Sequence, residues 1–167
     1  IVGAGAIGLE LGDFFGMMGS KITIVEAAPH IAPTEDADIA KEMDRVQSKA
    51  GRTCITGVMA KSLVTKDGQA ELTLGDGRVL TASKALVAVG RTPNTAGLDC
   101  EKAGCTLKRR GFVDVNDHLE AAEGVYAIGD VVGGYQLAHA AYAEGEAALA
   151  DMLGEEARAE QSDRRGE

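Results

Sequence analysis

IVGAGAIG, residues 1–8, decides the fold class, because it places Gly-x-Gly-x-x-Gly directly after an apolar strand end and before a helical pattern. A dinucleotide site needs this arrangement. Gly3 allows the tight strand-to-helix turn, Gly5 lets a pyrophosphate approach the backbone, and Gly8 lets the helix pack close to the strand. The helix N-terminus adds free N–H groups and a partial positive charge. The stretch therefore predicts a dinucleotide-binding turn.

An acidic residue follows the second apolar run and favours one of the two nicotinamide cofactors. Residues 22–25 are apolar and end at Glu26, at the distance where a carboxylate accepts hydrogen bonds from the adenosine ribose hydroxyls. A 2′-phosphate would be repelled there and would need a nearby cation. The next residues, Ala27-Ala28-Pro29-His30, contain no Arg or Lys. The pattern predicts NAD rather than NADP; the alternative is a packing turn with a solvated Glu26.

Composition and charge exclude several partner classes. The 167 residues are 45% hydrophobic and 26% charged, which is ordinary for a globular domain with a sizeable core. The net charge is 17 − 26 = −9, with no basic stripe, so a nucleic-acid partner is not expected. No apolar run approaches the roughly 20 residues of a membrane-spanning helix. The three cysteines, an odd number, do not form a disulfide framework.

The first half of the chain alternates between strand and helix patterns. Helices are expected over residues 6–18 and 35–50, the second ending at Gly51. Their apolar faces comprise Ile7, Leu11, Phe14, Phe15 and Met18 in the first helix and Ile39, Met43 and Val46 in the second. Parallel strands are expected over residues 1–4, 21–26, 53–56 and 85–89, the last one buried in the middle of the sheet.

Short alternating segments interrupt this order before the last strand. Residues 60–65, 70–74 and 78–80 alternate between apolar and polar side chains, with turn signals at Lys66-Asp67-Gly68 and Gly75-Asp76-Gly77. They predict an antiparallel three-stranded flap inserted as a crossover. The fold class is therefore α/β, with a Rossmann-like parallel sheet and this flap.

Beyond residue 89 the pattern changes, and two positions suggest ligand contacts. Gly90 lies at the carboxyl end of the apolar strand, where ligands of open α/β sheets bind. Residues 124–130 are expected to form another buried strand that ends in Gly129-Asp130, and residues 133–139 lead into a helix that runs through Met152. A carboxylate at a strand end can hold a polyol chain. The alternative is that Asp130 caps a loop.

Four ordered motifs together resemble the pyridine nucleotide–disulfide oxidoreductases, and most closely the dihydrolipoyl dehydrogenases within that family. The motifs are the glycine turn with Leu9-Glu10-Leu11-Gly12, Val89-Gly90-Arg91-x-Pro93-Asn94, Tyr126-Ala127-Ile128-Gly129-Asp130, and Leu137-Ala138-His139-x-Ala141-x-x-Glu144-Gly145. The resemblance covers residues 1 to about 153. It implies an NAD-binding domain over residues 1–93 and the C-terminal portion of an FAD-binding domain over residues 94–153. Residues 154–167 are expected to be a disordered tail.

The resemblance also implies a role for individual residues. NAD would be held by Gly3, Gly5, Ala6, Ile7, Gly8, Glu26 and Gly90, with Met59 at an adenine-contacting position where the family tends to have Val. Glu10 would pair with a flavin-side lysine that this chain does not contain. Gly129 and Asp130 would meet the flavin ribitol, and Leu137, Ala138 and His139 would line its pyrimidine side. No metal site is implied.

The function implied is that of the NAD(H)-binding part of an FAD-dependent dihydrolipoyl dehydrogenase-like enzyme, in which hydride passes between nicotinamide and flavin. The chain begins within a strand and without Met, which predicts a piece of a longer protein. The resemblance implies that this longer protein is a homodimer. The redox disulfide of the N-terminal FAD half and the His-Glu pair of the C-terminal dimerisation domain are missing here. We therefore expect no catalytic residue in this chain and no activity from it alone. The expected location is cytoplasmic, or the mitochondrial matrix in a eukaryote.

Two other classes of function stay open. One is another flavoprotein disulfide reductase, which would reduce mercuric ion or glutathione or catalyse transhydrogenation. The other is a nucleotide-binding or scaffold protein without catalysis. The missing segments would carry the residues that discriminate between them.

The cysteine and histidine residues do not have the sequence context expected of catalytic or metal-binding residues. Cys100 and Cys105 have the Cys-x-x-x-x-Cys spacing of the family's redox pair, but they lie after the Val-Gly-Arg motif and lack its Gly-rich surroundings and following Pro. We expect two ordinary thiols in a polar turn, and Cys54 as a small core residue. The histidines, which are His30, His118 and His139, do not have the spacing of metal ligands.

Overall fold

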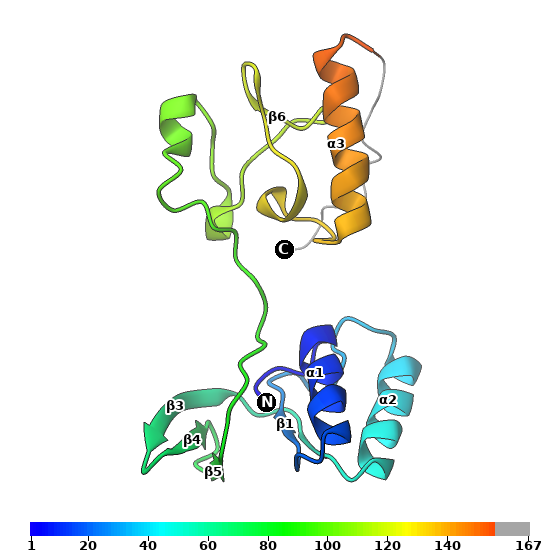
Figure 1. The fold of residues 1–167 in the computed structure, drawn as a ribbon, viewed down its shortest axis with the longest axis vertical. Helices are drawn as coiled ribbons and strands as arrows, with labels where there is room; N and C mark the ends of the chain where they lie inside the picture. Colours follow the sequence, from blue (N-terminus) through cyan, green and yellow to red (C-terminus); the bar gives the residue numbers. More distant parts are fainter. Residues whose placement is uncertain (156–167) are drawn as a thin grey trace. The chain divides into compact units, whose positions relative to one another are not determined.

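The computed structural model describes residues 1–155, which divide after Gly90 into two compact units, the first from Ile1 to Gly90 and the second from Arg91 onward. Figure 1 shows the helices and strands of each unit. The units are described one at a time below.

A parallel layer forms the centre of the first unit. Strand β1 (Thr23–Val25) pairs in parallel with β2 (Thr53–Ile55), with Ile24 opposite Cys54. On its other side β1 meets Val2, which forms parallel bridges to both Val25 and Val87. The order β2, β1, Val2, Val87 is that of a Rossmann-like half, so the predicted fold class is confirmed.

Helix α1 (Ala6–Met17) buries a different face from the one predicted. Its buried residues are Gly8, Leu9 and Gly12. The predicted apolar face is wrong, because Ile7, Phe14, Phe15 and Met18 are 46%, 51%, 42% and 73% exposed. The physical reason is close approach: a Cβ on Gly12 would lie 3.1 Å from Ile1 Cδ1, so only small residues fit against the sheet there. Helical spacing alone does not distinguish this glycine face from the larger apolar face.

Helix α2 (Ala37–Lys49) also buries only part of its predicted face. Met43 packs against the core, but Ile39 and Val46 are about half exposed. The helix ends where predicted, since Gly51 adopts a φ of +75° just beyond the C-cap. Gln47 is buried, and its Oε1 accepts a hydrogen bond from Arg52 Nη1 at 2.9 Å, so the buried amide oxygen has a partner.

The arginine that follows α2 ties the two helices together. The Arg52 side chain is only 8% exposed, and its Nη2 lies 2.6 Å from Asp13 Oδ1 on α1. A Cβ on Gly16 of α1 would lie 3.0 Å from Arg52 Nε, so the guanidinium lies directly against the helix backbone.

The three-stranded flap is confirmed. It consists of β3 (Ala60–Lys66), β4 (Gln69–Leu74) and β5 (Val79–Ala82), antiparallel and in that order. Asp67 and Gly68 have φ values of +51° and +76°, which suits the tight turn of a two-residue hairpin. Leu72 and Leu74 form one buried cluster with Val2 and Val25, so the flap packs on the parallel layer.

Residues 85–89 do not form the buried strand that was predicted. Val87 forms a bridge to Val2, yet Val87 and Val89 are 56% and 69% exposed. Burial in the middle of a parallel sheet requires neighbours on both edges and cover on both faces. Within residues 1–155 this segment has its bridge to Val2 alone.

The second unit is built around helix α3 (Ala138–Met152), which begins and ends as predicted. The other elements are η1 (Cys100–Ala103), η2 (Arg109–Gly111), β6 (Glu120–Ala122), β7 (Val125–Tyr126) and η3 (Gly129–Val132). Leu119, Ala147 and Ala148 form its core, and Tyr126 packs against them. Figure 1 shows α3 alongside the hairpin that contains β6.

The buried strand predicted over residues 124–130 is wrong in most of its length. Only β7 is a strand; it pairs antiparallel with β6, and its two residues are half-buried. Gly129 has a φ of +74°, outside the range of a strand, and turns the chain into η3. Of the predicted disordered tail, residues 156–167 lie outside the described part of the chain. None of the described helices is long and apolar enough to cross a membrane.

Candidate functional site

The three motif glycines are required for different reasons. Gly3 has a φ of +99°, and a Cβ there would lie 2.3 Å from the Ala88 carbonyl oxygen. A Cβ on Gly8 would lie 2.1 Å from the Gly3 carbonyl oxygen. Gly5 has an ordinary φ of −74°, and a Cβ there would meet nothing within 4 Å. The fold therefore requires Gly3 and Gly8, whereas Gly5 leaves open space over the turn.

This open space lies at the N-terminus of α1. Gly5 is the N-cap residue, and no side chain among the described residues caps the helix. The first turn of a helix has N–H groups without partners in the helix, and its dipole favours an anion. Ala6 and Ile7 of this turn are exposed. The backbone here fits a phosphate group that approaches Gly5.

Glu26 follows the last residue of β1, and its carboxylate is held by the backbone. Oε2 accepts a hydrogen bond from Ala4 N at 2.7 Å, and Oε1 accepts one from Ala28 N at 2.8 Å. The alternative of a solvated Glu26 is wrong, since the residue is half-buried and its side chain is bonded at both oxygens. Each carboxylate oxygen has a second lone pair that can accept a hydroxyl.

Three further predicted residues of the first unit lie at its surface. Met59 is 70% exposed and follows Val58, whose N–H donates to the Glu26 carbonyl oxygen at 3.1 Å. The backbone therefore brings Met59 close to the Glu26 end of β1. Glu10 is exposed on α1, and Gly90, with a φ of +117°, ends the unit.

In the second unit, Asp130 lies in η3 and is paired rather than free. Arg91 Nη1 donates to Asp130 Oδ2 at 2.8 Å, and Arg91 Nη2 donates to the Gln136 carbonyl oxygen at 2.9 Å. Leu137 is the N-cap of α3, and Ala138 and His139 are exposed in its first turn. Asp130 and the start of α3 are thus joined through one guanidinium.

Sequence reasoning missed two residues beside Asp130. Arg91 lies within a recognised motif but was assigned no contact. Glu144 accepts a hydrogen bond from Gly129 N at 2.6 Å. The available signal was the i, i+3, i+4 spacing of Ala141, Glu144 and Gly145, which places a carboxylate between two small residues on one helix face.

All three cysteines are free thiols, which agrees with the prediction for Cys100 and Cys105. The predicted polar turn needs a correction, since Cys105 is buried and its N–H donates to the Cys100 carbonyl oxygen at 3.0 Å. Cys54 packs against the core as expected, and burial raises the pKa of its thiol. Residues 1–155 contain no group of three or more side chains that could hold a metal ion.

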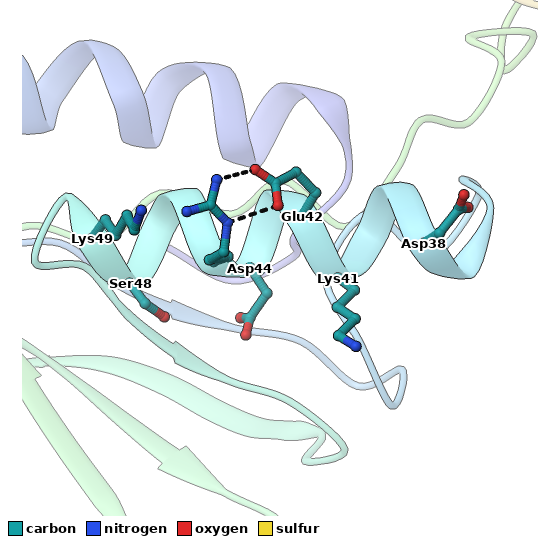
Figure 2. A pocket seen from close by; sticks show the side chains of 7 residues that line it. Asp38, Lys41, Glu42, Asp44, Ser48 and Lys49 are labelled. Atoms are coloured by element: carbon teal, nitrogen blue, oxygen red, sulfur yellow. Dashed lines mark hydrogen bonds and ion pairs between the residues drawn. The ribbon is translucent and has the colours of Figure 1, made fainter.

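The exposed face of α2 forms a shallow hollow lined by charged residues and Ser48 (Figure 2). Its charges balance, with Lys41, Arg45 and Lys49 against Asp38, Glu42 and Asp44. Glu42 and Arg45 pair with each other; this hydrogen bond lowers the pKa of Glu42 and raises that of Arg45. A single helix with mixed charges is typical of a solvated surface.

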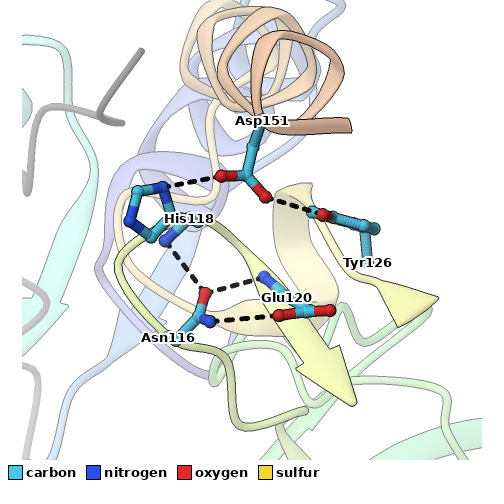
Figure 3. A network of polar contacts seen from close by, with 5 residues as sticks. All are labelled: Asn116, His118, Glu120, Tyr126 and Asp151. Atoms are coloured by element: carbon cyan, nitrogen blue, oxygen red, sulfur yellow. Dashed lines mark hydrogen bonds and ion pairs between the residues drawn. The ribbon is translucent and has the colours of Figure 1, made fainter. Parts of the chain in front are cut away.

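A polar network joins the β6–β7 hairpin to the last turn of α3 (Figure 3). Tyr126 Oη donates to Asp151 Oδ2 at 2.6 Å, and His118 Nδ1 lies 2.9 Å from Asp151 Oδ1. Asn116 Oδ1 accepts the amides of His118 and Glu120 at 2.9 and 3.0 Å. A carboxylate at a helix C-terminus is unfavourable, and the Tyr126 hydroxyl offsets this at Asp151.

The Tyr126 hydroxyl is expected to ionise late in an alkaline titration, at a higher pH than an ordinary tyrosine. The hydrogen bond to Asp151, with burial and the Asp151 charge as smaller causes, raises the pKa of Tyr126 to about 12. A folded-state pKa above the unfolded value, about 10, means that this stabilisation is fully present below pH 10 and is lost as the pH rises towards 12.

Tyrosinate absorbance during an alkaline titration checks this prediction. The late phase should disappear in Tyr126→Phe, move to lower pH in Asp151→Asn and persist in Tyr135→Phe, which removes an exposed tyrosine. A late phase unaffected by Tyr126→Phe would contradict the assignment.

The parallel layer, the glycine turn and the crossover flap define a Rossmann-like α/β protein. The chain belongs to the pyridine nucleotide-disulphide oxidoreductase family, whose model matches residues 1–145. It is 39% identical over 163 residues to a dihydrolipoyl dehydrogenase of Thermus scotoductus, covering 94% of this chain and 35% of that protein.

Two solved structures are also similar. The crystal structure of LpdA from Mycobacterium tuberculosis matches with a TM-score of 0.86 and 34% identity, over 92% of this chain and 34% of that one. The HOCl-induced flavoprotein disulfide reductase RclA of Escherichia coli matches with a TM-score of 0.85 and 32% identity, over 94% and 36%. The chain thus spans about a third of the length of these relatives.

Proposed function

We propose that this chain is the NAD(H)-binding part of an FAD-dependent, dihydrolipoyl dehydrogenase-like oxidoreductase in which hydride passes between nicotinamide and flavin. The observation that carries the proposal is the combination of open space over Gly5 and a carboxylate held at both oxygens at Glu26. The family and the dihydrolipoyl dehydrogenase relatives support the enzyme class.

The nucleotide would bind along the carboxyl edge of the parallel layer. The N–H groups of the α1 first turn, at Ala6, Ile7 and Gly8, face the position of a pyrophosphate that approaches Gly5. Glu26 would accept the adenosine ribose hydroxyls, and Met59 would lie against the adenine. Gly90, at the end of the segment that bridges to Val2, would meet the nicotinamide side.

FAD would use residues of the second unit. We assign Gly129 and Asp130 to the ribitol, and Leu137, Ala138 and His139 to the pyrimidine side of the ring. We propose that Glu10 supports the flavin site by pairing with a lysine near the flavin, which this chain does not contain. The corresponding domains are residues 1–93 for NAD and 94–153 for the C-terminal portion of the FAD domain. Bound FAD would supply a two-electron acceptor, and the residues named here would bind and orient it.

A second candidate function is that of another disulfide reductase of the same family, which would reduce mercuric ion or glutathione or catalyse transhydrogenation. The similarity to a protein described as an HOCl-induced flavoprotein disulfide reductase supports this second function. A non-catalytic nucleotide-binding fragment is the third. We expect residues 1–167 alone to bind no stoichiometric FAD, because the resemblance assigns to them only the ribitol and ring contacts of FAD and not those of its adenine and pyrophosphate. We also expect them not to oxidise dihydrolipoamide, because thiolate chemistry requires a lowered pKa and an accessible sulfur, and Cys105 is buried.

Calorimetric titration of the chain with NADH and NADPH tests the proposal. We expect NADH to bind at least about tenfold more tightly, since a single hydrogen-bonded pair to a charged group contributes roughly 1.5–3 kcal/mol. Equal or tighter binding of NADPH would contradict the NAD assignment. Binding of neither nucleotide would leave the glycine turn as a packing feature and refute the proposed function.

A further inference from the structure

The turn that carries Asp130 packs tightly against α3. Gly129 has a φ of +74°, and a Cβ there would lie 3.3 Å from Ala141 Cβ. One turn further along α3, a Cβ on Gly145 would lie 3.4 Å from Ile128 Cδ1. Glycine at each position lets the turn and the helix approach closely, and Glu144 lies beside both contacts.

The carboxylate of Glu144 bonds the turn directly. Its Oε2 accepts the Gly129 N–H at 2.6 Å in a part-buried position. This N–H is the first amide of η3, and η3 has no side-chain cap of its own at Ile128. A hydrogen bond with one ionised partner is roughly twice as strong as a neutral one. Glu144 therefore restrains the peptide that immediately precedes Asp130.

The Asp130 side chain has a weaker restraint. Its ion pair with Arg91 is half exposed on both sides, at 49% and 51%. Ion pairs of this exposure contribute little to stability because water and salt screen them. The part-buried bond from Glu144 to the preceding Gly129 peptide is thus a stronger restraint on this turn than the Arg91 ion pair.

We propose that Glu144 is a positioning residue for Asp130: it holds the Gly129 peptide so that the Asp130 carboxylate faces a flavin hydroxyl. The inference rests on the proposed function for the role of Asp130. Glu144 itself touches no reacting atom and acts only through the turn.

The test compares Glu144→Ala and Glu144→Gln in the flavin-loaded protein that carries this chain. The Gln amide oxygen can still accept the Gly129 N–H, so Glu144→Gln should keep FAD affinity within about threefold of the unsubstituted protein. Glu144→Ala should weaken it about tenfold or more, because the Gly129 N–H loses its partner. Glu146→Ala, exposed on the same helix, is the matched control and should change neither affinity nor flavin spectrum.

A second readout follows the turn itself in the 167-residue chain. At fixed pH, the hydrogen bond to Glu144 should hold the Gly129 amide proton downfield in the NMR spectrum. This proton should move upfield in Glu144→Ala and stay close to its original position in Glu144→Gln. FAD affinity in Glu144→Ala equal to that in Glu146→Ala, or no rescue by Gln, would overturn the proposal.

Asp130→Asn separates this inference from the proposed function. Unchanged FAD affinity in Asp130→Asn would refute the ribitol role and, with it, the inference. A loss in Asp130→Asn without a loss in Glu144→Ala would overturn the positioning role alone.

Discussion

Gly8→Ala is expected to lower the free energy of unfolding by about 3 kcal/mol or more, at the upper end of overpacking substitutions. The added Cβ would lie 2.1 Å from the Gly3 carbonyl oxygen, and a backbone atom cannot move aside as the end of a flexible side chain can. Gly5→Ala meets no atom within 4 Å and should cost only about 1 kcal/mol, the loss of a favourable N-cap residue. Denaturant titration followed by circular dichroism measures both values.

Gly5→Ala should affect nucleotide binding much more than it affects stability. The methyl group of Gly5→Ala occupies the space that a pyrophosphate would use, so NADH affinity should fall about tenfold or more while the fold persists. Ser48→Ala, on the exposed face of α2, serves as the control and should bind NADH normally. Normal NADH binding by Gly5→Ala would refute the pyrophosphate site. Equal stability of the Gly8→Ala and Gly5→Ala proteins would refute the packing explanation.

The features that the sequence predicts correctly depend on local backbone conformation. Gly3 and Gly51 adopt positive φ values where a tight turn and a helix end were expected. Asp67-Gly68 turns the flap as an Asp-Gly hairpin should. Glu26 lies at the end of β1 because the apolar run before it forms that strand. Each of these signals lies within a few residues of the structure that it specifies.

Burial was predicted less well because it depends on what packs against an element. Phe14 and Phe15 are large and helically spaced, yet α1 meets the sheet through Gly8 and Gly12. The exposure of Val87 and Val89 was not predicted, because apolar composition does not show which layers cover a strand. The Glu144–Gly129 bond joins residues 15 positions apart, and no local pattern shows that α3 folds back onto that turn.

Replacing Glu26 should reduce NADH affinity and the preference for NADH over NADPH. In Glu26→Ala, the N–H groups of Ala4 and Ala28 lose their acceptors, and the ribose hydroxyls lose theirs. Losing a hydrogen-bonded charged partner costs roughly 1.5–3 kcal/mol, which is about a 10- to 150-fold weaker Kd for NADH. NADPH should lose less, because removal of the carboxylate also removes a charge that repels the 2′-phosphate.

Three variants separate ribose recognition from shaping of the turn. Glu26→Gln has one acceptor oxygen facing two backbone donors, so it should retain only one of the two hydrogen bonds and bind NADH weakly. Glu26→Ala combined with Ala27→Arg places a guanidinium at an exposed position and should raise NADPH affinity above that of Glu26→Ala. Calorimetry with both nucleotides, with denaturation of the same proteins, measures these effects. An equal loss for NADH and NADPH in Glu26→Ala would show that the carboxylate only shapes the Ala4 turn. A falling NADH-to-NADPH affinity ratio at similar stability is the result that direct ribose recognition requires.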